Sequence, residues 1–531
     1  MFSMLHFRKT ISVGWKIIIE CIVIYSLLHW IDIIAATSRH PAGDGPHILG
    51  TATRLAQLLL DGEWSLFVIC FSSLLGPHPP FAYVPFMTIE FLGGGSTNTS
   101  HLWAGALVLW FCWDGIRRLG GSLFGFFWMV SLTPIWLQSE TAGIDLVAAA
   151  TVIQSISHLA KSDGLKHRWH VAGWGVWMGA AFMTKYTAPM FLWAPCLFTG
   201  YWIIRYQRWD RLILGFFSFL IIAFPWWSTH AQNVYGYVMA SGDGSSGLLT
   251  NKVIIEGPWY IWENISWYPA AIADAMGWQA MILIIIAILT SRMKAFMWCV
   301  CLSSFLGGWF MLNAQKQRQD RYIIPAYPVM SAMVGHSWVG IPSLYYSWKN
   351  VEESKRLYSY VGPTPAQRDY EHHIDTAGKN WPTPSQSYWP IDQNPQKWGV
   401  DEMLKKLRQH HGSNEGTVGF LLEEEGGAPG YGMILRRATA LGYRWHIATV
   451  MVVQPNGQQF QDSNRPLASI FVGPFLFGEW PSRDFDTLLV VQRRQHNDWE
   501  NYITSTKMIL EENFKLPQNR KARIYKKQRT Q

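Results

Sequence analysis

The stretch GDGPHILG, residues 43–50, places an acid and a histidine just after the first long apolar run of the chain. Asp44 could serve as a general base for a hydroxyl or an amine, and His47 could contact a phosphate or an acceptor. A solvated loop acid or a helix cap is the simpler interpretation of Asp44 alone. The choice depends on which other ionisable residues accompany it.

Two further acids lie in SETAGIDLVAAA, where Glu140 precedes Asp145 by five residues. Asp145 opens a predicted helix, and the helix dipole favours a negative charge at that position whether or not it is functional. Acids from separate loops that face one compartment also suit general-base catalysis, or coordination of a cation near a phosphate. Asp145 is therefore a second catalytic candidate, with Glu140 as a substrate contact.

Cationic and polar candidates stand at the ends of other apolar runs. Lys185 and Tyr186 follow the run GAAFMT, and Arg321 and Tyr322 open RYIIPAYP. A lysine that snorkels to the membrane surface and an interfacial Arg/Tyr anchor are the simpler interpretations. The functional interpretation is contact with phosphate, for which arginine offers bidentate geometry.

His78 precedes two prolines in GPHPPFAYVP, and these prolines fix the backbone as it meets the membrane. A rigid turn is one interpretation, and orientation of an acceptor or a phosphate is the other. Acids and cations on one face of a bundle that can hold a lipid tail meet the needs of attack on a lipid-phosphate-linked sugar. A base would activate the acceptor, and positive charge would stabilise the departing phosphate.

The composition indicates that a membrane bundle positions these residues. Of 531 residues, 49% are hydrophobic and only 15% are charged, and the chain holds 30 Trp. The net charge of +8 comes from short basic clusters between apolar runs, which is typical of membrane orientation and argues against a nucleic-acid partner. The six cysteines lie in or beside apolar runs and indicate neither a disulfide framework nor a zinc site.

We predict a mainly α, polytopic bundle of about ten helices over residues 1–345, and residues 79–93 offer an eleventh candidate span. The predicted spans are 12–36, 98–115, 120–138, 144–160, 169–184, 186–204, 210–228, 267–290, 293–313 and 321–340. Two long outer loops, 37–97 and 229–266, separate some of them, and long ordered loops often carry function.

The segment 79–93 decides the topology. If it does not cross, the basic clusters between spans lie on the cytoplasmic side. The outer face then holds Asp44, His78, Glu140, Asp145 and Lys185. We favour this non-crossing interpretation. The same count leaves the C-terminal tail in the cytoplasm, so the side of the tail stays open.

Residues 346–531 are predicted to form a small soluble α/β domain, because roughly a quarter of them are charged against about a tenth of residues 1–345. Strand-like runs cover 417–422, 445–453, 486–491 and 522–526, and helical patterns cover 429–441 and 497–511. The tail shows no phosphate-binding glycine motif or catalytic triad signature.

The order of the motifs DGPHILG, HPPFAYVP, SETAGIDLVAAA, GAAFMTKYTAPMFL and RYIIPAYP resembles the GT-C class of polyprenyl-phosphate-sugar glycosyltransferases, near the protein O-mannosyltransferase and lipid A aminoarabinose transferase branch. The resemblance covers about residues 1–345. It implies that Asp44 is the catalytic base, Asp145 the second acid and Lys185 a contact to the lipid phosphate. Arg321 and Tyr322 match the late RY signature of the class.

This chain also departs from the class. Gly45 follows Asp44 where many relatives have a second acid, His47 stands where an arginine or another polar group is common, and His78 replaces a lysine. The resemblance requires no cofactor and leaves open a weak divalent-cation site at Asp44 and Asp145. Soluble tails in the class usually lie on the active-site side, and we favour that side for this tail, which requires either that the segment 79–93 crosses or that the count misses or merges a span late in the bundle.

We therefore expect an inverting glycosyltransferase of the plasma (inner) membrane. It would move a sugar from an undecaprenyl- or dolichyl-phosphate donor to a lipid, glycan or protein acceptor at the outer, periplasmic face. A lipid or solute transporter is one alternative, although no internal repeat supports it. A non-catalytic assembly subunit with the same fold is another, and Gly45 keeps it open.

Overall fold

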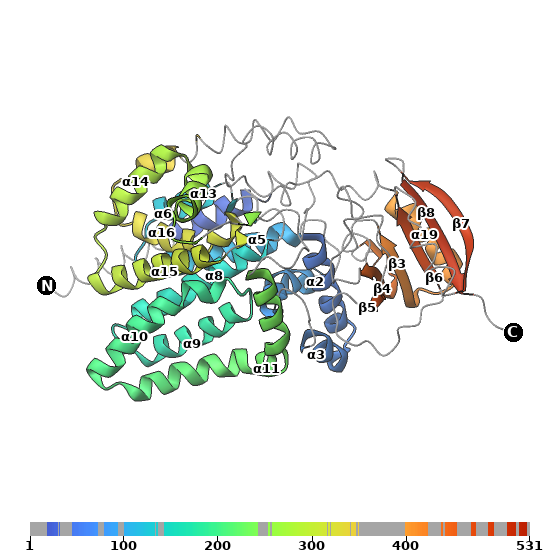
Figure 1. The fold of residues 1–531 in the computed structure, drawn as a ribbon, viewed down its shortest axis with the longest axis horizontal. Coiled ribbons are helices and arrows are strands. Elements are labelled where there is room, and N and C mark those ends of the chain that lie inside the picture. Colours follow the sequence, from blue (N-terminus) through green and yellow to red (C-terminus); the bar gives the residue numbers. More distant parts are fainter. Residues whose placement is uncertain are drawn as a thin grey trace.

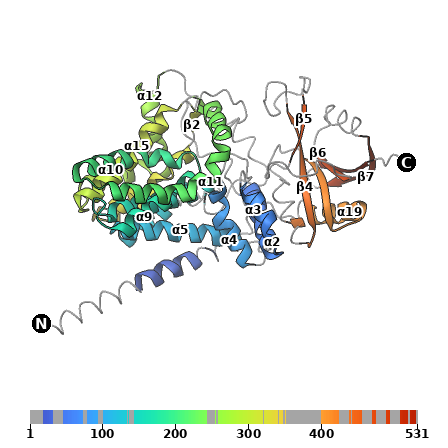
Figure 2. The same cartoon turned by 90° about the horizontal axis from the view of Figure 1, so that it is seen from below.

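The structure is a computed structural model that contains a helical part and a C-terminal sheet (Figure 1). It describes residues 18–29, 31, 45–72, 79–93, 100–132, 134–135, 138, 143–242, 253–254, 258–315, 317–318, 320–339, 341–346, 349, 399–422, 437–438, 441–453, 469–473, 487–492, 507–516 and 520–527. Figure 2, seen from below, agrees with Figure 1 that α2 and α3 lie between the other helices and the sheet.

Helices make up most of the described chain. Residues 18–29 of the first apolar run are helical. The labelled helices of the first part are α2 (Gly45–Leu60), α3 (Trp64–Ser72), η1 (Pro80–Tyr83), α4 (Val84–Leu92), α5 (Ser100–Arg118), α6 (Leu123–Val130) and α8 (Ile144–Lys161). They are followed by α9 (Arg168–Phe182), η2 (Ala188–Phe191), α10 (Trp193–Tyr206), α11 (Trp209–Gly242), α12 (Trp262–Ile265), α13 (Trp267–Met276), α14 (Trp278–Leu289), α15 (Ala295–Ala314), η3 (Asp320–Ile323) and α16 (Ala326–Val334).

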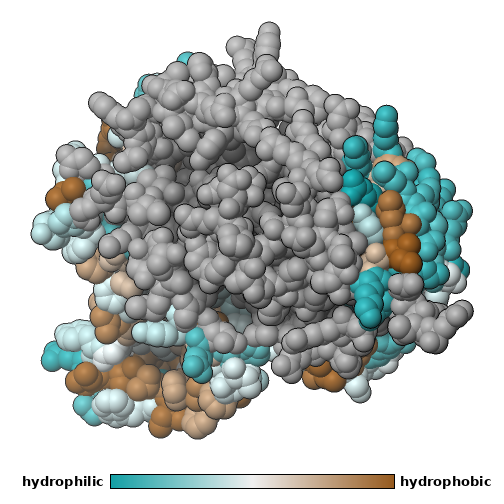
Figure 3. Space-filling view, turned by 45° about the vertical axis from the view of Figure 1, so that its right-hand side comes forward, coloured by the Kyte–Doolittle hydropathy of each residue, from teal (hydrophilic) through white to brown (hydrophobic). Residues whose placement is uncertain are grey.

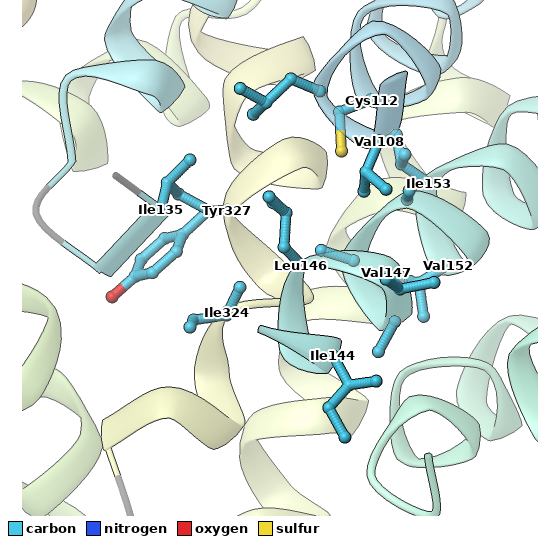
Figure 4. Close-up of a cluster of buried hydrophobic side chains, with 14 of the residues drawn as sticks. Val108, Cys112, Ile135, Ile144, Leu146, Val147, Val152, Ile153, Ile324 and Tyr327 are labelled. Atoms are coloured by element: carbon cyan, nitrogen blue, oxygen red, sulfur yellow. The ribbon is translucent and has the colours of Figure 1, made fainter. Parts of the chain in front are cut away.

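Helix α8 is the centre of the helical part. Every residue of α8 except His158 and Lys161 is buried, and the helix packs against α5, α9, α15 and α16. Figure 4 shows Val108 and Cys112 of α5 and Tyr327 of α16 beside the apolar side chains of α8. Because α8 is enclosed on all sides, its ends are held in fixed positions relative to the neighbouring helices.

Helices α9 and α11 approach each other closely through glycines. A Cβ on Gly175 would lie 2.1 Å from the carbonyl oxygen of Gly215, and one on Gly179 would lie 2.8 Å from Cβ of Ile222. Two glycines four residues apart are a common device for close helix packing in membranes. This contact fixes α9, which carries the loop with Lys185 at its end.

The chain is a multi-pass membrane protein. Among the described residues, the helices Trp209–Gln232 and Ala295–Ala314 are long and apolar enough to span a bilayer. The pair Trp267–Ala273 and Trp278–Leu289 would add a third span but bends by 106°. Gly277, at φ +84°, sits in this break, and a positive φ suits glycine.

Other predicted spans form shorter helices than expected. Within the predicted span 120–138, α6 has eight residues and ends at Val130, ahead of Pro134, which cannot continue a helix. Within the span 321–340, α16 has nine residues and lies between Pro325 and Gly335. The total of about ten spans stays a prediction.

The segment 79–93 contains η1 and α4, which together form an apolar helix from Pro80 to Leu92. At 1.5 Å per residue its length is about 20 Å, shorter than the hydrocarbon core of roughly 30 Å. This length favours the predicted interpretation in which the segment does not cross the membrane.

The C-terminal part holds a six-stranded sheet of order β5-β4-β3-β6-β8-β7. The strands are β3 (Glu415–Leu422), β4 (Arg444–Val453), β5 (Ser469–Gly473), β6 (Thr487–Gln492), β7 (Met508–Leu516) and β8 (Arg520–Lys527). Strand β3 is parallel to β4 and β6, and the remaining pairs are antiparallel. Helix α19 (Val400–His411) packs against β6 and β8.

The four predicted strands of the tail coincide with β3, β4, β6 and β8. The helix predicted over 497–511 is wrong from Met508 onward, because these residues pair with β8 as strand β7. Of the helix predicted over 429–441, residues 437–438 are helical and most of the rest lies outside the described residues. In Figure 3 the described surface of the sheet end is mostly hydrophilic with one apolar stripe, whereas apolar and polar residues are mixed over the helices. The domain boundary near residue 345 stays a prediction.

Candidate active site

A buried ion pair joins two of the predicted site residues. Lys185 Nζ lies 2.5 Å from Asp145 Oδ1, and the two side chains are 6% and 1% exposed. Arg321 Nε lies 3.9 Å from the other carboxylate oxygen, Oδ2. The carboxylate therefore faces a cation at each oxygen, and the three residues come from α8, the loop between α9 and η2, and η3.

The ring of Tyr322 lies beside both cations. Lys185 Nζ is 5.1 Å from the ring centroid, and Arg321 Cζ is 6.0 Å from it. A cation within about 6 Å of an aromatic face is attracted by the negative charge of that face. Tyr322 thus adds an aromatic wall that holds positive charge near Asp145.

Asp145 owes its position to the start of α8. The Gly143 N–H donates to the carbonyl of Gln138 at 2.8 Å, which closes the turn before the helix. A Cβ at Gly143 would lie 1.7 Å from Oε1 of Gln138, so this approach requires glycine. Asp145 then falls in the first helical turn, where the helix dipole stabilises a carboxylate.

Helix α15 supports the loop that carries Lys185. Ser304 Oγ donates to the Phe191 carbonyl at 2.8 Å, and a Cβ on Gly308 would lie 2.2 Å from Cδ1 of Phe191. Phe191 ends η2, six residues after Lys185. The sequence analysis missed Ser304 and Gly308. The glycine pair 307–308 inside an apolar run was the signal that could have found them.

The motif HPPFAYVP lies beside the same loop. The Phe81 N–H donates to the carbonyl of Met183 at 2.8 Å, two residues before Lys185. Helix η1, which contains Phe81, also packs against α8 and α2. Three motifs far apart in the sequence therefore meet at one end of α8.

The segment 229–266 was predicted as a long loop, but the structure extends α11 to Gly242 and forms α12 at Trp262–Ile265, because the apolar helical run continues past residue 228. Part of this segment pairs with the residues that lead to Arg321. Strands β1 (Val253–Ile254) and β2 (Gln317–Arg318) pair antiparallel, with Val253 opposite Arg318. The two paired residues of β2 come shortly before η3. The pairing therefore brings residues 253–254 next to the segment that leads into η3 and Arg321.

The structure brings together Asp145, Lys185, Arg321 and Tyr322. Tyr186 packs instead toward α11, against a cluster that includes Met183 and Trp226. His47 belongs to the first turn of α2, and only its backbone is described. Asp44, His78 and Glu140 lie outside the described residues.

The described residues contain no group of three His, Cys, Asp or Glu side chains that could hold a metal ion. The weak cation site expected at Asp44 and Asp145 needs Asp44, which is not among them. With a cation at each oxygen, the Asp145 carboxylate is suited to hold Lys185 and Arg321 in place. The assembled group offers buried positive charge for an anionic ligand.

Comparison with solved structures identifies the fold. No protein-family model matches the chain, and no curated protein matches it by sequence. The crystal structure of ArnT from Cupriavidus metallidurans bound to undecaprenyl phosphate is similar, with a TM-score of 0.56 and 12% identity over 97% of this chain and 98% of that one. The apo structure of the same ArnT gives a TM-score of 0.54 at 12% identity and the same coverage. This confirms the GT-C fold that the sequence resemblance implied.

Proposed function

We propose that the chain is a membrane glycosyltransferase that moves a sugar from a polyprenyl-phosphate donor to a lipid, glycan or protein acceptor on the outer face of the plasma membrane. The observation that carries this proposal is the buried group of Lys185, Arg321 and Asp145. It lies in a chain with the fold of ArnT, whose crystal structure holds undecaprenyl phosphate.

In the proposed reaction the acceptor nucleophile attacks the anomeric carbon of the donor sugar. The bond from that carbon to the phosphate oxygen breaks, and the lipid phosphate leaves with the electron pair. Asp44 takes the proton of the acceptor as general base. Attack from the face opposite the phosphate inverts the anomeric configuration.

Lys185 and Arg321 would stabilise the charge that develops on the departing phosphate. Cations fixed in a water-poor site act more strongly than they would in water, because the surrounding dielectric is low. Lys185 is 6% and Arg321 14% exposed at the side chain, so both lie in such a site. Tyr322 would keep the two cations on the same side.

Asp145 would act by positioning these cations. Burying an ammonium group without a counter-charge is costly, and Asp145 supplies that counter-charge before the donor arrives. When the phosphate binds, its oxygens would share Lys185 and Arg321 with the carboxylate. This role differs from proton transfer, which we assign to Asp44.

The test is transfer from a radiolabelled polyprenyl-phosphate sugar by the full chain in proteoliposomes. General bases contribute about 10²- to 10⁴-fold, so Asp44→Asn should reduce the rate of transfer by that factor. Asp61→Asn is the matched control, because Asp61 is another acid of the same region and its carboxylate accepts a hydrogen bond from its near neighbour Gln57 at 2.8 Å. Undiminished transfer by Asp44→Asn would remove the proposed base.

The same assay addresses the metal and the donor contacts. Transfer measured with and without a chelator shows whether a divalent cation takes part. Lys185→Met should lower kcat more than it raises KM, because its charge matters most as the phosphate departs. An unchanged kcat in Lys185→Met would contradict the assigned contact.

A further inference from the structure

The end of the bundle opposite Asp145 gathers several turns of the chain. Asp145 and Lys161 stand at the two ends of α8, about 24 Å apart along the helix axis. At the Lys161 end, Arg208 donates to the carbonyl of Gly164, which joins the α10–α11 turn to the α8–α9 turn. The α14–α15 turn reaches the same place, because Lys294 contributes to the electrostatic environment of Asp163.

Cations outnumber acids at this basic end. Its described cations are Arg117, Arg118, Lys161, Lys166, Arg168, Arg205, Arg208, Arg211, Arg292 and Lys294, and its described acids are Glu20, Asp114, Asp163 and Asp210. Each acid is already within 3.2 Å of an arginine or lysine. Among the described residues, the remaining cations have no acid within ion-pair distance, so positive charge is in surplus.

The side chains that continue inward do not supply the missing negative charge. Arg118 contacts Nε2 of His158, and Nδ1 of His158 lies 3.4 Å from Nδ1 of His170. His167 follows, with its ring centroid 6.2 Å from that of His170. Gly173 makes room for this line, since a Cβ there would lie 2.3 Å from His158 Nδ1. Imidazoles are neutral or positive, so they leave the surplus in place.

The pKa of Asp163, in the α8–α9 turn, also reflects the surplus of positive charge at this end. A hydrogen bond from Lys166 holds the pKa of the Asp163 carboxyl below its usual range, and the charges of Lys166, His167 and Lys294 act in the same direction. Lys166, His167 and Lys294 are all exposed at this surface. They can therefore reach an anion that approaches from outside the protein.

Exposed aromatic residues place this surface at the level of lipid headgroups. Trp169 is 88% exposed and Trp209 50% exposed, and both adjoin the basic turns in sequence. The Tyr206 ring lies 5.4 Å below the guanidinium of Arg208. Tryptophan and tyrosine concentrate where the hydrocarbon core meets water, so the neighbouring cations lie at phosphate depth.

We propose that the basic end binds the phosphate groups of anionic phospholipids, with the exposed cations Arg292, Lys294 and Arg168 as the contacts on adjoining turns. Surplus lysine and arginine at headgroup depth attract anionic lipids, and basic surfaces between helix ends are a known form of such recognition. The proposal concerns the end of the bundle far from Asp145 and is independent of the proposed transfer reaction. Free phosphate shares this chemistry, so the test must separate the two sources.

The test uses the full chain in nanodiscs of phosphatidylcholine, with and without phosphatidylglycerol. We expect phosphatidylglycerol to raise the midpoint of thermal unfolding and to remain bound in native mass spectrometry. Each cation near an anionic surface is worth about fivefold in affinity, so Arg292→Gln with Lys294→Gln should weaken retention about 25-fold. Lys515→Gln with Lys521→Gln, two exposed lysines of the sheet, is the matched control.

The outcomes separate the sources. Equal retention of phosphatidylglycerol by the test variant and the control would overturn the proposal. Inorganic phosphate that raises the midpoint as much as phosphatidylglycerol, in nanodiscs of phosphatidylcholine alone, would assign the surface to free anions instead. Equal midpoints of all variants in phosphatidylcholine alone establish that the substitutions leave the fold intact.

Discussion

Breaking the pair of Asp145 and Lys185 should destabilise the protein far more than removing an exposed charge. At an effective dielectric constant of 20, the Coulomb attraction over 2.5 Å is about 7 kcal/mol, and that between Asp145 and Arg321 over 3.9 Å is about 4 kcal/mol. Desolvation offsets much of this attraction, so Asp145→Asn should cost about 3–5 kcal/mol because it removes the carboxylate that pairs with a buried ammonium. Lys185→Met should cost a similar amount.

The double variant Asp145→Asn with Lys185→Met distinguishes pairing from mere burial. Because it removes both charges, it should cost less than the two single changes together, by about 3 kcal/mol. Arg321→Gln should cost less than Lys185→Met, since its distance to the carboxylate is longer. Equilibrium unfolding of the unsubstituted chain and the four variants in detergent measures all these free energies. Additivity of the two single changes within about 0.5 kcal/mol would refute the proposed pairing.

Two further predictions concern packing and pH. Gly308→Ala should cost about 1–3 kcal/mol of stability and reduce transfer, because the new Cβ would meet the Phe191 ring. Gly200→Ala should be neutral or stabilising, because a Cβ there meets nothing within 4 Å. Thermal unfolding of both variants checks this prediction. In the sheet, Lys406 beside Glu512 holds the pKa of the Glu512 carboxyl below its usual range. The ionised carboxylate therefore stabilises the fold fully above the usual unfolded pKa of about 4.3, and this stabilisation is lost as the pH falls through the lower folded pKa. Amide exchange of the sheet, corrected for intrinsic rates, should therefore rise on acidification, and Glu512→Gln should flatten that rise.

Helix positions could be predicted where an apolar run was uninterrupted. The predicted spans 144–160 and 293–313 correspond closely to α8 and α15, because neither run contains a proline and the small residues within them pack against neighbours. The span 267–290 was predicted as one helix, but Gly277 allows a sharp bend that hydropathy does not reveal. Strand β7 was mistaken for a helix, since the apolar residues of MILEENFKL also fit a helical period.

The site could be predicted in its members but not in its contacts. Asp145 and Lys185 stand at neighbouring ends of consecutive helices, so the sequence placed them on one face. Their direct pairing depends on the turn at Gly143 and on the support of Phe191 by α15, neither of which a pattern of residue types displays. The interpretation of Lys185 as a snorkelling surface lysine is wrong, because its side chain is buried against Asp145. The roles of Asp44, His47, His78 and Glu140 stay predictions.

The most direct measurement is a high-resolution density map of the purified chain in lipid with a polyprenyl phosphate added. The proposed function predicts a prenyl tail between the helices that ends in a phosphate beside Lys185 and Arg321, with Asp44 facing an open outer cavity. A site that stays closed to the lipid, or one filled by a partner protein, would contradict the proposed donor site and return the chain to the class of non-catalytic assembly subunits.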